Sequence, residues 1–127
     1  MNTPLRIGIC GLGTVGQAVV RLLREEGETL ARRAPRPLEI TARGMRSPKA
    51  GFDPGTIPVH QDVLAVARDP AVDVVVELMG GTEDAKTLVE LALAEGKAVV
   101  TANKALLSEY GDALFAAATA KGLPLAF

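Results

Sequence analysis

Six residues near the N-terminus have a glycine spacing that can hold a phosphate group. The segment Gly11-Leu12-Gly13-Thr14-Val15-Gly16 matches the pattern G-x-G-x-x-G, between an apolar run and an amphipathic stripe of helical spacing. A pyrophosphate must come within hydrogen-bonding distance of backbone amides, and a side chain at either of the first two glycines would block the turn or the approach. An ordinary glycine-rich turn is the alternative, but the flanking strand and helix patterns favour a dinucleotide site.

The end of the second apolar run is basic where a dinucleotide site needs a group that contacts the adenosine ribose. An acidic residue there favours NAD, whereas a basic residue suits the 2′-phosphate of NADP. This segment contains Arg43 and Arg46, and residues 21–49 hold eight basic and four acidic residues although the whole chain has a net charge of -1. Because an arginine fork matches phosphate geometry, we expect NADP(H) to be favoured, with NAD(H) possible. A solvated basic face without a ligand is the alternative.

Two later segments have residues suited to the reactive end of such a cofactor. In open parallel sheets, ligands lie beyond the carboxyl ends of the strands, where Gly80-Gly81 and the segment from Thr101 to Lys104 are expected. The glycine pair would let the backbone approach a ribose, although a plain helix-entry turn explains it equally well. Lys104 lies in an apolar segment, and a buried ammonium is costly unless it is paired. It therefore either holds a carbonyl oxygen or moves a proton, or it is a helix lysine whose ammonium reaches solvent.

These candidates lie in a chain that alternates between short apolar runs and helical patterns, which is typical of βαβ units. We therefore expect an α/β fold with a doubly wound parallel sheet in one domain. The expected strands are 5–10, 38–46, 72–78, 97–101 and 123–127. The expected helices are a stripe from Val15 to Leu23, then 61–68, 82–96 with Thr82 as N-cap, and 108–121 with Ser108 as N-cap, and residues 47–58 form a loop.

Composition restricts the class of protein further. Basic and acidic residues nearly balance and only 3% of the 127 residues are aromatic, so we expect neither nucleic-acid binding nor an anionic membrane surface as partner. No apolar run approaches the length of a membrane span, and residues 1–10 do not resemble a secretory signal. Cys10 is the only cysteine, which suits a cytoplasmic protein without a cysteine-rich metal site.

Three single residues are harder to interpret from the sequence. We expect Cys10 to be a small buried residue rather than a nucleophile, because no second cysteine or histidine constellation surrounds it. His60 is the only histidine, and its place at the entry to a short helix favours a surface or capping role. Glu77 is the only charged residue late in the strand 72–78, where it could meet either a ligand or a backbone amide.

Three segments have a recognisable combination of motifs: they run from Arg6 to Gly16, from Asp73 to Gly81 and from Gly96 to Leu107. The last two contain V-E-L-x-G-G and V-x-T-A-N-K-A-L-L in this order. Taken together, the three segments resemble homoserine dehydrogenase. The resemblance implies a Rossmann-type NAD(P)-binding domain over residues 1–127. It also implies an enzyme that reversibly reduces L-aspartate 4-semialdehyde to L-homoserine, in the biosynthesis of threonine, methionine and isoleucine.

The resemblance also implies roles for individual residues. It places Leu12, Gly13, Thr14 and Val15 at the pyrophosphate, Arg46 with Arg43 at the adenosine end, and Gly80, Thr101 and Asn103 at the nicotinamide side. Lys104 matches the site lysine of the family. An ammonium near an aldehyde oxygen that gains negative charge is chemically sensible as a stabiliser or proton donor.

The family continues beyond the equivalent of Phe127 into a substrate-binding and dimerisation domain with a second site lysine. We therefore expect a truncated chain that binds cofactor without turnover, and a homodimer when the protein is full length. Two other functions remain open. One is an NAD(H)-sensing binding module, which gives no reason for Asn103-Lys104. The other is the cofactor domain of another amino-acid oxidoreductase, such as an aspartate dehydrogenase.

Overall fold

The computed structural model describes residues 5–11, 38–44, 59–79 and 81–127. These ranges form the strands β1 (Leu5–Cys10), β2 (Leu38–Gly44), β3 (Val59–His60), β4 (Val74–Glu77), β5 (Ala98–Thr101) and β6 (Leu125–Ala126). They also form the helices α3 (Val63–Arg68), α4 (Glu83–Ala94) and α5 (Lys104–Lys121). The expected stripe from Val15 to Leu23 and the expected loop 47–58 lie outside the described residues.

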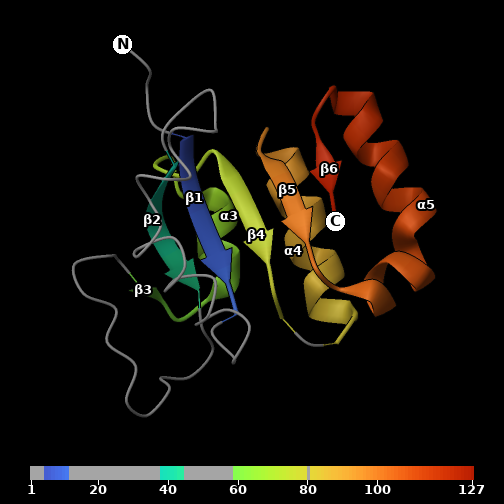
Figure 1. Cartoon of the computed structure of the whole chain (residues 1–127), viewed down its shortest axis with the longest axis horizontal. Coiled ribbons are helices and arrows are strands. Elements are labelled where there is room, and N and C mark those ends of the chain that lie inside the picture. The colour runs from blue at the N-terminus through green and yellow to red at the C-terminus, as the bar shows by residue number, and fades with distance from the viewer. Residues whose placement is uncertain (1–4, 12–37, 45–58, 80) are drawn as a thin grey trace.

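The strands form one parallel sheet whose order reverses in the middle. The order across the sheet is β3-β2-β1-β4-β5-β6, and each neighbouring pair is parallel. The chain moves outward from β1 to β3, returns to the centre and moves outward again from β4 to β6, which is the doubly wound arrangement. Figure 1 shows α3 and α4 on the same face of the sheet, with α5 beside α4. The α/β fold class predicted from the sequence is confirmed.

The core lies between this face of the sheet and the helices α3 and α4. In α4 the buried residues follow helical spacing, so that one stripe of the helix meets the sheet; they are Ala85, Leu88, Val89, Ala92 and Leu93. Residues of the central strands complete the layer, including Cys10 and Val75, whose side chains are fully buried. Gly8 lets α3 approach closely, because a Cβ there would clash with a methyl group of Val66. None of the three described helices is long and apolar enough to cross a lipid bilayer.

Most predicted elements exist, and several of their boundaries differ. β2 ends at Gly44 rather than 46, and β4 begins at Val74 rather than 72. The two-residue strand β3 was not expected. α3 begins at Val63 instead of 61 because Asp62 is the N-cap and accepts a hydrogen bond from the Leu64 amide at 3.0 Å.

The predicted start of the last helix is wrong. α5 begins at Lys104, four residues before Ser108, because Asn103 is its N-cap and accepts a hydrogen bond from the Leu106 amide at 3.0 Å. Asparagine is as good an N-cap as serine, so propensity alone did not separate the two positions. At α4, Thr82 does occupy the predicted N-cap position, although its side chain makes no capping hydrogen bond within the described structure.

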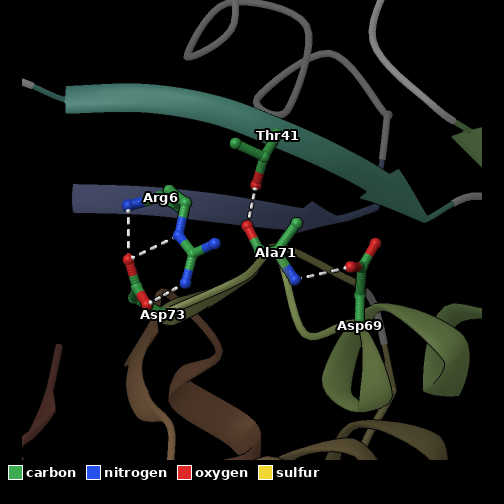
Figure 2. Close-up of polar contacts among 5 residues, drawn as sticks. All are labelled: Arg6, Thr41, Asp69, Ala71 and Asp73. Atoms are coloured by element: carbon green, nitrogen blue, oxygen red, sulfur yellow. Dashed lines mark hydrogen bonds and ion pairs between the residues drawn. The ribbon is translucent and has the colours of Figure 1, made fainter. Parts of the chain in front are cut away.

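The turn between α3 and β4 fastens the amino-terminal end of β4 to β1 and β2 (Figure 2). Asp73 accepts hydrogen bonds from the Arg6 amide at 2.9 Å and from the Arg6 guanidinium at 2.9 and 3.1 Å. The Thr41 hydroxyl donates to the Ala71 carbonyl at 2.6 Å, and the Ala71 amide donates to Asp69 at 2.8 Å. The turn is therefore fixed to β1 through Arg6 and to β2 through Thr41.

The side chain of His60 contacts the same turn, although its backbone pairs with Gly44 at the carboxyl end of β2. Its Nε2 lies 3.1 Å from a carboxylate oxygen of Asp69. Burial alone would raise the pKa of Asp69, but the hydrogen bonds from the Ala71 amide and from His60 outweigh it and hold this pKa below its usual value. The expectation for His60 was a surface or capping role; the N-cap of α3 is Asp62, and His60 instead contacts the residue that follows the helix.

Thr41 provides a test of this turn. Thr41→Val keeps the shape of the side chain and removes its hydrogen bond to Ala71, so the free energy of unfolding should fall by about 1 kcal/mol. Thr87→Val is the matched control, because the Thr87 hydroxyl bonds the Glu83 carbonyl at 3.1 Å on the exposed side of α4, where water can replace it. Urea unfolding followed by circular dichroism measures both variants. Equal losses in the two variants would contradict this assignment.

Candidate functional site

The carboxyl ends of three neighbouring strands meet in register at the point where the strand order reverses. Cys10 of β1 pairs with Glu77 of β4, and Glu77 pairs with Thr101 of β5. The strands point the same way, so their ends lie along one edge of the sheet (Figure 1). In doubly wound folds, ligands bind in the crevice outside this edge at the reversal. The described residues of the selected segments, which are Gly11, Gly81 and Thr101 to Lys104, therefore lie at the expected edge.

Gly11, directly after β1, lies in close contact with the backbone that follows β4. Its φ of +98° lies in the region that favours glycine, and a Cβ there would lie 2.8 Å from the Leu78 carbonyl oxygen. Its amide donates to the Gly44 carbonyl at 2.9 Å, which ties the turn to the end of β2. The requirement for glycine at the first position of the motif is thus explained. The other motif residues, Leu12 to Gly16, lie outside the described residues.

Glu77 has its carboxylate inside the protein at the centre of this edge. The residue has 0% of its surface exposed. One carboxylate oxygen accepts the Thr101 hydroxyl at 2.6 Å, and the other accepts the Met79 amide at 2.7 Å. Of the two roles left open by the sequence, the structure shows the second: Glu77 binds a backbone amide.

Thr101 and Asn103 continue the same network. The Thr101 oxygen also accepts the Asn103 amide at 3.0 Å, and the Asn103 side-chain amide donates to the Gly81 carbonyl at 2.6 Å. Both residues are buried. Their side chains therefore shape the segment between β5 and α5, and their contact with the nicotinamide side of a cofactor stays a prediction. Gly80, the third residue predicted at that side, lies outside the described residues.

Lys104 immediately follows this network as the first residue of α5. It is exposed, so the expected apolar setting is wrong for this chain. The first turn of a helix carries the positive end of the helix dipole, where a lysine is electrostatically unfavourable. Helix stability therefore does not explain a lysine at this position. Its side chain is exposed at the carboxyl edge of the sheet.

The two arginines predicted at the adenosine end are Arg43 and Arg46. Arg43 is the next-to-last residue of β2, pairs in register with Ile9 and is fully buried. Arg46 lies outside the described residues. The predicted contacts of both arginines with a cofactor stay predictions.

Cys10 is excluded as a reactive thiol. It is fully buried, and its Sγ donates a weak hydrogen bond to the Val63 carbonyl at 3.8 Å. Burial, and after it the negative charge of Glu77, raises the pKa of this thiol to about 12, so it stays protonated at neutral pH. The expectation of a small buried residue is confirmed. Within the described ranges, no three His, Cys, Asp or Glu residues come together as a metal site.

The sequence did not predict that the polar residues at the strand ends form hydrogen bonds with one another and with the backbone inside the protein. A single glutamate after three β-branched residues indicated a special position but not its partners. The signal that was available for Asn103 was its preference for the N-cap position ahead of the apolar residues Leu106 and Leu107.

Comparison with known proteins gives one consistent result. Residues 11–127 match the family model described as the NAD-binding domain of homoserine dehydrogenase. A homoserine dehydrogenase from Pseudomonas aeruginosa is 46% identical over 124 residues, which are 98% of this chain and 29% of that protein. One from Corynebacterium glutamicum is 40% identical over 129 residues, which are 99% of this chain and 28% of that protein.

Solved structures agree with the sequence comparisons. The crystal structure of a homoserine dehydrogenase from Thiobacillus denitrificans has a TM-score of 0.92 and 44% identity, covering 98% of this chain and 29% of that one. A homoserine dehydrogenase from S. aureus has a TM-score of 0.87 and 31% identity, covering 100% of this chain and 33% of that one. The chain thus spans about a third or less of the length of these relatives. Since the family model matches residues 11–127, the chain belongs to the family of homoserine dehydrogenase NAD-binding domains.

Proposed function

We propose that this chain is the cofactor-binding part of an enzyme that reversibly reduces L-aspartate 4-semialdehyde to L-homoserine. The observation that supports this most is the convergence of Gly11, the Glu77 network and Lys104 on the edge where a doubly wound sheet binds dinucleotides. The remaining part of the enzyme supplies the rest of the substrate site. The isolated chain accordingly binds the cofactor and does not turn over homoserine.

The residues at the edge suit a nicotinamide dinucleotide. Gly11 has no Cβ, so its backbone fits tightly against Leu78. The adjoining motif residues, Leu12 to Gly16, are proposed to meet the pyrophosphate. The cofactor supplies the hydride that reduces the aldehyde carbon. Lys104 holds the aldehyde oxygen as negative charge develops on it, and its ammonium donates the proton that completes the alcohol.

The finer cofactor preference follows from charge. The basic segment 21–49 and the absence of an acidic residue between Arg43 and Lys49 support NADPH over NADH, because a carboxylate there would repel the 2′-phosphate. Arg46 is the residue proposed to contact that phosphate, and Arg43, three residues earlier in the sequence, is proposed as a second contact. The full-length protein is proposed to be a cytoplasmic homodimer.

Two rival functions predict different behaviour. An NAD(H)-sensing module would bind one redox form far more tightly than the other and would not need an exposed lysine at the start of α5. The cofactor domain of an aspartate dehydrogenase would require a different substrate domain after Phe127. The match to the homoserine dehydrogenase domain over residues 11–127 favours the first proposal over both.

Arg46→Glu tests the proposed cofactor preference. It should weaken NADPH binding by about 1.5–3 kcal/mol, or about 10- to 150-fold, and NADH binding much less, because only NADPH presents a phosphate to the guanidinium. Arg68→Glu is the control: it makes the same charge change at an exposed residue in the last turn of α3. Fluorescence titration with each cofactor measures the two dissociation constants. Equal weakening of NADPH and NADH by Arg46→Glu would show that Arg46 is an ordinary surface charge.

Lys104→Ala in the full-length enzyme tests the proposed reaction. Loss of one preorganised group at a developing oxyanion should lower kcat by about 10²- to 10³-fold and leave the dissociation constant of NADPH nearly unchanged. Lys121→Ala serves as the control, because Lys121 is an exposed lysine in the last turn of the same helix. Steady-state oxidation of homoserine gives kcat, and cofactor titration gives the affinity. Normal turnover by Lys104→Ala would overturn the assignment of Lys104.

A further inference from the structure

Glu77 joins the segment that follows β4 to the segment that follows β5 at the carboxyl edge of the sheet. The residues from Leu78 to Gly81 lead from β4 into α4, and residues 102–103 lead from β5 into α5. One oxygen of the Glu77 carboxylate binds the first segment at the Met79 amide, and the other binds the hydroxyl of Thr101, which precedes the second. A single buried carboxylate therefore fixes the distance between the two segments.

The bonds around Glu77 form a closed circuit. From Glu77 the circuit passes through the Thr101 hydroxyl to the Asn103 amide. The Asn103 side chain then returns to the first segment, donating to the carbonyls of Gly81 at 2.6 Å and Met79 at 3.4 Å. The Met79 amide closes the circuit on Glu77. A ring of hydrogen bonds of this kind holds all its members in one arrangement, since moving one member weakens several bonds.

Lys104 is covalently attached to this circuit. Asn103, its direct neighbour, also caps α5 through the Leu106 amide at 3.0 Å, so the same side chain sets both the segment and the start of the helix. The direction in which Lys104 leaves the sheet edge therefore depends on the Glu77 carboxylate. Glu77 itself has 0% of its surface exposed, so it cannot meet a substrate or a cofactor directly.

We propose that Glu77 is a positioning residue for Lys104: its carboxylate sets the place of the lysine relative to the segment 78–81. The proposal rests on the proposed function, because it gives Lys104 a role in turnover. A carboxylate suits the position because it offers two acceptors to two donors. A glutamine has nearly the same shape but presents an NH₂ group to one of the two donors, which breaks one connection of the circuit.

A double-mutant cycle in the full-length enzyme tests this inference. Glu77→Gln alone should lower kcat about tenfold, because the ammonium of Lys104 is misplaced. In the Lys104→Ala background the same change should lower kcat less than about twofold, because no ammonium remains to be placed. Glu90→Gln is the control, since it removes the charge of an exposed glutamate in α4 and should leave kcat unchanged in both backgrounds.

The outcomes separate this inference from the proposed function. If Lys104→Ala alone retains normal turnover, the proposed role of Lys104 is wrong and the inference is wrong with it. If Lys104→Ala lowers turnover but Glu77→Gln lowers kcat by the same factor in both backgrounds, Glu77 affects turnover independently of Lys104. That result overturns the inference and leaves the proposed function intact.

A second variant keeps the test decisive if Glu77→Gln fails to fold. Thr101→Val removes the hydroxyl through which Glu77 reaches Asn103 and changes no charge. It should show the same dependence on Lys104 in the cycle, and Thr101→Ser, which keeps the hydroxyl, should recover most of the lost kcat. Equal losses from Thr101→Val in both backgrounds, or no recovery by Thr101→Ser, would overturn the inference.

Discussion

A carboxylate that has no contact with solvent must find its hydrogen-bond donors within the protein, and Glu77 finds them in two different segments of the chain. This requirement makes the carboxyl edge of the sheet a single unit. The end of β4, the start of α4 and the start of α5 cannot shift independently, because each shift would leave a charged oxygen short of a donor. Thr101 and Asn103 extend the same constraint to the first residue of α5.

The other half of the edge depends on a steric constraint. Gly11 is pressed against the backbone at Leu78, where a Cβ would lie 2.8 Å from the carbonyl oxygen, and its amide bonds the end of β2. The Leu78 amide in turn donates to the Cys10 carbonyl at 2.9 Å. The turn after β1 and the Glu77 unit after β4 thus share one backbone contact. Glycine at position 11 therefore places the part of the edge proposed to meet the pyrophosphate relative to the part proposed to meet the nicotinamide side.

The parts of this arrangement that follow from local pattern could be predicted from the sequence. The β-branched run before Glu77 indicated a central strand, and the stripe of apolar residues from Ala85 to Leu93 indicated a helix packed on the sheet. The alternation of such elements predicted the parallel doubly wound sheet. The glycine spacing after β1 predicted the position of the tight turn, and the structure supplied the contact that explains Gly11.

The parts that depend on contacts between distant residues could not be predicted in this way. The start of α5 was wrong because Asn103 and Ser108 are equally good N-caps, and the choice between them depends on contacts of Asn103 with Gly81, 22 residues away in sequence. The setting of Lys104 was wrong because its apolar neighbours in sequence suggested burial, whereas the helix turns them to other faces. A tertiary hydrogen bond decided the start of α5, and the direction of side chains around the helix decided the setting of Lys104.

Hydrogen exchange with and without NADPH, measured by mass spectrometry on this chain, is the most direct test that the carboxyl edge is the dinucleotide site. NADPH should slow amide exchange in peptides that contain residues 11–16, 78–81 and 101–104. It should leave the turn at residues 69–73, at the opposite edge of the sheet, unchanged. Protection at residues 69–73 without protection at the carboxyl edge would contradict the account.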